Sequence, residues 1–157
     1  MSSPSAIQLI CHRRGAPGLR LGLGPALQPL GALGQLQQLL NSHSFWAQGR
    51  SRGGLVRMLQ GSAAVVSAWQ GSRLVGFGRA SSDGLYRAVL WDVVVAAELQ
   101  GQGLGRRLVE TLLQHPQLRH VERIYLMTSN SAGFYQRLGF ETVSTQQLLV
   151  HRQTSSG

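Results

Sequence analysis

The sequence predicts an α+β fold in three layers, with a mixed and mostly antiparallel sheet flanked by helices. Two strand-like runs, 63–69 and 74–80, are joined by the hairpin signal Gln70-Gly71-Ser72, and the Asp83-Gly84 pair turns the chain into a third strand. Two consecutive hairpins make this part of the sheet antiparallel, which argues against a doubly wound parallel fold. A whole helix separates the third strand from the next one, at 123–128, so those two strands can run parallel.

Length and composition set the class of protein. At 157 residues the chain is expected to form one domain, 1–157. No apolar run reaches the roughly 18 residues of a membrane span, and the first 24 residues lack the apolar block of a secretory signal. We therefore expect a protein of the cytoplasm or of an organelle stroma. Cys11 is the single cysteine, which predicts a buried or inert thiol and neither a disulfide nor a cysteine metal cluster.

The charge is strongly basic. The net charge is +9, the chain contains no lysine, and no acidic residue precedes Asp83. Such a field attracts anions, among them the phosphates of a nucleotide-like ligand, a nucleic acid or an acidic protein surface. The arginines are scattered, and no stripe of basic residues alternates with aromatic ones, so nucleic-acid binding is not favoured.

The first half of the chain supplies one strand and two helices before the hairpins. Residues 6–12 read as a strand, with one face formed by Ile7, Leu9 and Cys11. After a stretch rich in Gly, Pro and Arg, a helical face is marked by leucines at 27, 30, 33, 36 and 40. A loop at 41–49 holds Phe45 and Trp46, and Ser51 can cap a short second helix that Gly61 ends.

The second half contains a buried strand at 89–95 and a helix that starts at Leu104 and ends before Pro116. A short helix at 131–138 follows the strand at 123–128 and has Gly139 as its C-terminal cap. A last strand is expected near 147–151. Few residues remain after Phe140, so this edge of the sheet is expected to be abbreviated.

The corner between the buried strand and its helix is rich in glycine. Three glycines at 101, 103 and 105 leave room for phosphates to approach the backbone, and the unpaired N–H groups of the helix's first turn point toward them. Arg106 and Arg107 add full positive charge. The Rossmann and P-loop fingerprints do not match this spacing, because the pattern is Gln100-x-x-Gly103-x-Gly105 and no lysine exists. The corner is suited to a pyrophosphate.

This stretch resembles the Q/R-x-x-G-x-G/A acetyl-CoA signature of the GNAT superfamily of N-acetyltransferases. In the signature the preceding strand's final valine lies eight residues before the central glycine, as Val95 does before Gly103. A second segment, 133–140, has the sequence GFYQRLGF and is similar to the family's later FY…LGF motif. The amino-acid sequence at 90–95 and 100–105 is especially similar to that of a plastid and cyanobacterial group of the family, which includes arylalkylamine (serotonin) and protein-lysine acetyltransferases.

The resemblance implies a splayed pair of parallel strands with the pantetheine arm of acetyl-CoA in the gap, and it requires no metal. By position, the residues expected to bind the cofactor are Val93, Val95, Gln100, Gly101, Gln102, Gly103, Leu104, Gly105 and Arg106. Tyr135 matches the family's tyrosine that protonates the leaving sulfur. The family often has an asparagine seven residues before that tyrosine; here Thr128 holds the position and Asn130 is displaced by two.

The resemblance also implies an acetyl transfer to a primary amine, by direct attack in a ternary complex. An alkylamine with a pKa near 10.4 is only about one part in two thousand neutral at pH 7, so a proton acceptor is needed. Asp92, within the central strand, either relays that proton through water or hydrogen-bonds in the core. Residues expected to line the acceptor site are Phe45, Trp46 and Tyr86.

Three functions remain in competition. The first is an acetyl-CoA-dependent N-acetyltransferase whose acceptor is an arylalkylamine or, as the runner-up, a protein lysine or N-terminus. The second is a catalytically weak acyl-CoA-binding regulatory module. The third is a basic protein associated with nucleic acid, as the net charge of +9 allows.

Overall fold

The computed structural model describes residues 6–153, which divide between Met127 and Thr128 into two compact units. The first unit contains a five-stranded sheet in the order β1-β2-β3-β4-β5. Its strands are β1 (Ile7–His12), β2 (Ala64–Gln70), β3 (Arg73–Ser82), β4 (Arg87–Val95) and β5 (Arg123–Tyr125). The first four pair antiparallel, and β4 pairs with β5 in parallel. The predicted mixed and mostly antiparallel sheet is confirmed.

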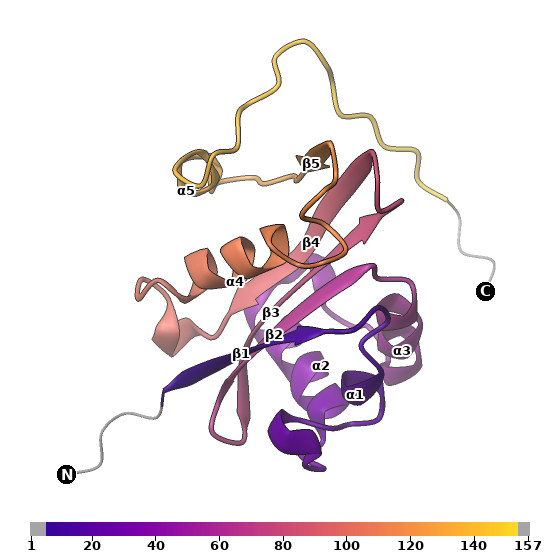
Figure 1. Cartoon of the computed structure of the whole chain (residues 1–157), viewed down its shortest axis with the longest axis vertical. Coiled ribbons are helices and arrows are strands. Elements are labelled where there is room, and N and C mark those ends of the chain that lie inside the picture. The colour runs from indigo at the N-terminus through magenta and orange to yellow at the C-terminus, as the bar shows by residue number, and fades with distance from the viewer. Residues whose placement is uncertain (1–5, 154–157) are drawn as a thin grey trace. The chain divides into compact units, whose positions relative to one another are not determined.

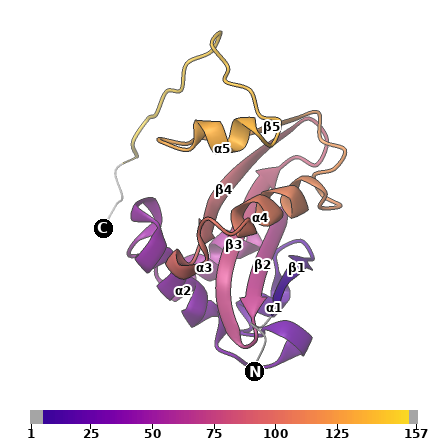
Figure 2. The same cartoon turned by 90° about the vertical axis from the view of Figure 1, so that its left-hand side faces the viewer.

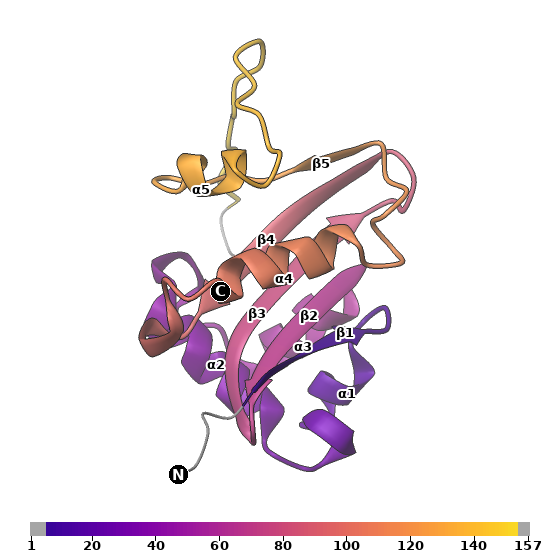
Figure 3. The same ribbon diagram turned by 60° about the vertical axis from the view of Figure 1, so that its left-hand side comes forward.

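Helices cover both faces of this sheet, as Figures 1 and 3 show: α4 lies across one face, and α1, α2 and α3 lie on the other. The longest helix in the described part of the chain has 12 residues, and none there is long and apolar enough to cross a bilayer. The α-helices of the first unit are α1 (Pro17–Arg20), α2 (Ala32–His43), α3 (Arg52–Gln60) and α4 (Leu104–Leu113). Its short 3₁₀ helices are η1 (Pro25–Leu27), η2 (Phe45–Ala47) and η3 (Ala97–Leu99).

Helix α4 lies close to β3 because two residues of that strand have no side chain. A Cβ on Gly76 would lie 3.0 Å from Leu108 Cδ1, and a Cβ on Gly78 would lie 2.9 Å from Leu112 Cδ1. Both leucines are fully buried. Leucine side chains of α4 therefore fill the space over the two glycines, and this contact fixes the helix, and with it the helix's N-terminus, on the sheet.

Strand β4 contains a bulge that changes which face its side chains occupy. The register with β3 shifts between Phe77↔Val94 and Arg79↔Trp91, so β4 has one extra residue there. Asp92 lies in the bulge with φ +57°, a value uncommon for a residue other than glycine. Because of the extra residue, Asp92 follows Trp91 onto the face that Arg79 shares, opposite to α4.

The parallel pair separates after three residues. β5 pairs with β4 only from Arg87↔Arg123 to Val89↔Tyr125, so within residues 6–153 the edge of β4 from 90 to 95 has no strand partner on that side. Figures 2 and 3 both show β5 beside the starting end of β4 alone. The predicted splay is confirmed. The free edge leads directly into the turn before α4.

The second unit contains α5 (Ala132–Gln136) and an extended segment. The amide of Phe140 donates to the Tyr135 carbonyl and that of Gly139 to Gln136, with Gly139 at φ +97°, so the predicted glycine cap is present as a Schellman motif. The predicted strand near 147–151 is wrong. Leu148 and Leu149 are 70% and 85% exposed, and a ladder needs a partner strand, of which the described part of this unit has none.

Two further expectations need correction. The first long helix begins at Ala32 rather than near Leu27, because Gly31 is its N-cap at φ +63° and Pro29 precedes it; Leu27 is 73% exposed. Cys11 is exposed rather than buried. Partial desolvation nevertheless raises the pKa of its thiol, so the expectation of low reactivity agrees with its surroundings.

Two hydrogen bonds link His12 to Ser67 and Trp69 of β2. Trp69 Nε1 donates to Ser67 Oγ (2.9 Å), and that oxygen lies 2.7 Å from His12 Nε2. Since an indole nitrogen only donates, the Ser67 oxygen accepts from Trp69, and the tautomer of the His12 ring decides which group donates in the second bond. Burial, with a contribution from His115, lowers the pKa of His12 to about 4.

We predict that this histidine makes the protein less stable in mild acid. The pKa in the folded state, about 4, lies below the unfolded value, so the unfolded chain binds the proton more readily. Stability is then full above the unfolded pKa of about 6.5 and declines as the pH falls toward 4, by at most about 3 kcal/mol. Urea unfolding at pH 7 and pH 5 should give a smaller difference for His12→Gln than for the wild type. His120→Gln, at an exposed site, should keep the wild-type difference.

Candidate functional site

The turn between β4 and α4 presents free backbone amides. Gly101 and Gly103 have φ of +79° and +86°, and Gly103 is the N-cap of α4, with no side chain capping the helix. The first backbone bond of the helix runs from Arg107 N to Gly103 O. Within residues 6–153 no acceptor pairs with the three preceding amides, of Leu104, Gly105 and Arg106. These donors, at the positive end of the helix dipole, suit an anion.

The space over this turn is open. A Cβ placed on Gly101 or on Gly103 would meet no atom within 4 Å, so nothing in the first unit's own packing requires these residues to be glycine. Their positive φ does require it, and the absence of side chains leaves the amides accessible. The turn therefore fits the phosphate end of a ligand whose remainder lies along the free edge of β4.

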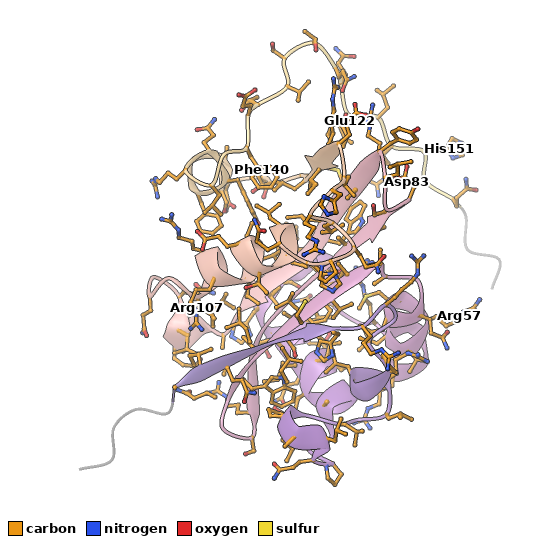
Figure 4. The ribbon with its side chains drawn as sticks, viewed as in Figure 1. Arg57, Asp83, Arg107, Glu122, Phe140 and His151 are labelled. Atoms are coloured by element: carbon orange, nitrogen blue, oxygen red, sulfur yellow. The ribbon has the colours of Figure 1, made fainter. Side chains whose placement is uncertain are left out.

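The polar side chains of the turn are partly engaged. Gln100 Nε2 donates to the carbonyl of Val95 (3.1 Å), which links the turn to the strand end, and Gln102 Nε2 donates to Glu98 O. Arg106 Nε pairs with Glu110 at 2.7 Å, which leaves the rest of its guanidinium free. Arg107, labelled in Figure 4, reaches back to the carbonyl of Ile7 at the start of β1 (3.3 Å) and so contributes to the structure.

Asp92 lies at the centre of a polar cluster on the other face of β4. Its carboxylate is 3% exposed and accepts three bonds: from Trp46 Nε1 (3.1 Å), Arg50 Nη1 (2.9 Å) and Arg79 Nε (2.8 Å). Burial would raise the pKa of this carboxyl, but the bonds and charges of the two arginines outweigh it, and the pKa is lowered. Of the two roles expected for Asp92, the structure shows the hydrogen-bonding one; a proton relay stays a prediction.

Sequence analysis missed both arginines of this cluster. Arg50 precedes α3 and Arg79 lies in β3, 29 positions apart, and no local pattern links either to Asp92. The one available signal was the scarcity of acids. A buried carboxylate needs a partner, and because the chain has no lysine, that partner could have been inferred to be arginine, but the sequence does not indicate which one.

The expected acceptor residues do not all lie together. Phe45 and Trp46 form an edge-to-face pair with ring centroids 5.1 Å apart, and they are 75% and 50% exposed. Tyr86 is also exposed, but it precedes β4 at the opposite end from the turn, about 20 Å along the strand from Asp92. The structure joins the aromatic pair to Asp92 and does not join Tyr86 to it.

Tyr135 lies within α5 of the second unit, beside two other aromatic rings. Its centroid is 4.9 Å from that of Phe134 and 5.7 Å from that of Phe140. Burial raises the pKa of its phenol, so the group holds its proton at neutral pH. A general acid must do the same. The assignment of Tyr135 to the reaction rests on the sequence motif.

A pocket of about 410 Å³ lies elsewhere. Its lining comes from the end of β1 and the segment after α4, and includes Arg13, Arg14 and His115. His115 Nδ1 accepts from the Gln117 amide, so the ring donates through Nε2 to the carbonyl of His12 (2.8 Å). This pocket is at the C-terminal end of α4, whereas the glycine turn is at the N-terminal end.

Comparison with known proteins identifies relatives that are similar in sequence to part of this chain. The chain is 47% identical over 73 residues to GCN5-related N-acetyltransferase 2, chloroplastic, of Arabidopsis thaliana, covering 46% of this chain and 28% of the relative. It is 45% identical over 69 residues to Serotonin N-acetyltransferase 2, chloroplastic, of Oryza sativa subsp. japonica, covering 43% and 34%. The chain thus spans about a third of the length of these relatives.

The fold has solved counterparts. A putative acetyltransferase of the GNAT family from Xanthomonas campestris pv. campestris superposes with a TM-score of 0.69 at 25% identity, over 97% of this chain and 96% of that one. The family model described as "Acetyltransferase (GNAT) family" matches residues 34–140, which include the aromatic pair, the bulge, the glycine turn and Tyr135. The chain therefore belongs to the GNAT family of acetyltransferases.

Proposed function

We propose that this protein binds acetyl-CoA at the glycine turn and transfers the acetyl group to a primary amine. The observation that carries the proposal is the uncapped N-terminus of α4, with free amides under an open turn, at the end of a strand whose edge is free from 90 to 95. Amides and arginines would hold the pyrophosphate, and the strand edge would offer backbone groups to the pantetheine. Membership of the family supports the same assignment.

Acetyl-CoA supplies an acetyl thioester, whose C–S bond breaks as a C–N bond to the amine forms. The chain's part is to orient the reactants and to manage protons. Backbone N–H groups on the free edge of β4 are available to a developing oxyanion. The Tyr135 phenol, protonated at neutral pH, would donate to the departing sulfur, and the proton lost by the amine would pass to water or to a relay.

For the acceptor, we propose a monoamine with an aromatic or apolar body. The exposed edge-to-face pair of Phe45 and Trp46 offers a surface on which such a body can stack. The net charge of +9 disfavours an acceptor with several positive charges. A lysine or N-terminus on an acidic protein surface is the runner-up, because such a surface is attracted by the same field. The chloroplastic relatives support an organelle stroma as the compartment.

Gly105→Val should weaken acetyl-CoA binding about tenfold or more, because branched carbons in the first turn of α4 would occupy the space of the pyrophosphate. Gly105 has ordinary helical backbone, whereas valine at Gly103, with φ +86°, would also strain the backbone. Isothermal titration measures the affinity. Gly53→Val is the matched control, because Gly53 is likewise the second residue of its helix, in open space. Equal affinity for a folded Gly105→Val and the wild type would exclude the turn as the cofactor site.

Tyr135→Phe should lower kcat by roughly 10-fold to 1000-fold and leave the affinity for acetyl-CoA nearly unchanged, because the hydroxyl acts on charge that forms during the reaction. Release of free thiol reports the rate. Tyr125→Phe, which removes a phenol from β5, should retain the wild-type kcat. A Tyr135→Phe variant as fast as the wild type would leave Tyr135 a packing residue.

A panel of amines should show a kcat/KM at least roughly tenfold higher for tryptamine or phenethylamine than for spermidine, since a polyamine meets the repulsive field more than once. A lysine-containing acidic peptide belongs in the same panel and tests the runner-up. A preference for spermidine would contradict the electrostatic reasoning. Binding of acetyl-CoA without thiol release for any amine would instead identify a regulatory acyl-CoA-binding module.

A further inference from the structure

The loop that carries the exposed aromatic pair is tied to the sheet at a single residue. This loop, residues 44–51, connects α2 to α3 and contains η2. Its bonds to α2 involve Gln37, Leu40 and Asn41. Among residues 6–153, every hydrogen bond from the loop to the sheet ends on Asp92: Trp46 Nε1 on Oδ1 and Arg50 Nη1 on Oδ2.

The indole bond decides how the aromatic pair is presented. Trp46 is half exposed, yet its nitrogen is anchored, so the ring can rotate little without breaking the bond to Asp92. Phe45 packs edge-to-face on that ring and has no other ordered aromatic neighbour in the described chain. The orientation of both rings therefore depends on the Asp92 carboxylate.

Both oxygens of the Asp92 carboxylate are already hydrogen-bonded within the protein. Oδ2 accepts from two arginines and Oδ1 from the indole, and the side chain is 3% exposed. One negative charge with two guanidinium groups leaves the cluster at +1, which repels an alkylammonium ion instead of attracting it. The backbone strain at φ +57° is retained in the bulge that turns Asp92 toward the loop.

We propose that Asp92 is a positioning residue for the acceptor: it fixes the loop at 44–51 so that Phe45 and Trp46 form a preorganised platform for the body of the amine. This inference rests on the proposed function and extends it. The ammonium proton then leaves by water, and Asp92 sets acceptor affinity through Trp46. Its removal acts on acceptor binding rather than on the chemical step.

Steady-state kinetics of three variants test the proposal. Trp46→Phe removes the indole N–H and retains an aromatic ring; Asp92→Asn removes the charge. Both should raise KM for the aromatic amine, by about 5-fold to 30-fold for one lost charge-assisted bond, with kcat within about 3-fold of wild type and KM for acetyl-CoA unchanged. The double variant should lose little more than the worse single variant, because both changes act on the same bond, between Trp46 and Asp92. Trp69→Phe, which removes an indole bond to Ser67 in β2, a strand that does not pair with β4, should leave both constants unchanged.

The opposite pattern would overturn the proposal. If Asp92 accepts the amine's proton, Asp92→Asn should lower kcat by about 100-fold or more, abolish the acidic limb of the kcat profile and leave acceptor KM unchanged, while Trp46→Phe behaves as wild type. Should Asp92→Asn not fold, Trp46→Phe decides alone: an unchanged acceptor KM rejects the platform.

A measurement without turnover separates this proposal from the proposed function. The chain has three tryptophans, so 5-fluorotryptophan labelling gives three ¹⁹F resonances, and Trp46→Phe assigns one of them. In Asp92→Asn the Trp46 resonance should shift and broaden, while that of Trp69, in β2, should be unchanged. An unchanged Trp46 resonance overturns the positioning role even in an active enzyme. If the Trp46 resonance shifts in Asp92→Asn but the wild type acetylates no amine, the proposed function alone is disproved.

Discussion

The extra residue in β4 is the constraint on which both halves of the candidate site depend. Without it, strict alternation would continue from Leu90, which pairs with Ala80, and would put Asp92 on the face that α4 covers. With it, Asp92 meets Arg79 and Arg50, while Val93 and Val95 stay on the α4 side near Gly78 and Gly76. One residue thus directs a charge to the loop at 44–51 and leaves apolar side chains beneath α4.

Packing of α4 explains how the unpaired amides of its first turn reach the end of this strand. The helix has a buried stripe of Leu104, Leu108 and Leu112, and β3 presents bare backbone under it at two glycines. Arg107 adds a bond from the same helix to the start of β1. The helix is therefore held along its length, and its uncapped N-terminus can leave amides unpaired without loosening the turn.

The features that could be predicted from the sequence depend on residues close to one another along the chain. The signals at 100–105, the capping by Ser51, whose Oγ accepts from Gly54 N, and the cap at Gly139 depend on residues within a few positions of one another. The failures had other causes. The leucine spacing from 27 to 40 continues through Gly31, but the αL conformation of Gly31 starts the helix at Ala32. The apolar residues at 148–150 suit a strand, but a strand also needs a partner, and these residues are exposed. The single-domain assignment to 1–157 stays a prediction.

By itself the sequence determined the order of the elements, the mixed sheet, the glycine turn and the family, because periodicity, turn chemistry and motif spacing are properties of neighbouring residues. Only the tertiary structure decided that β4 carries a bulge at Asp92, that the parallel pair ends at Val89, and that Trp46, Arg50 and Arg79 converge on one carboxylate. Trp46 and Asp92 are 46 positions apart, and what joins them is packing of the loop at 44–51 against the sheet. No local pattern encodes such a contact, because the cost of burying this carboxylate is offset by hydrogen bonds and charges of residues that are distant in the sequence.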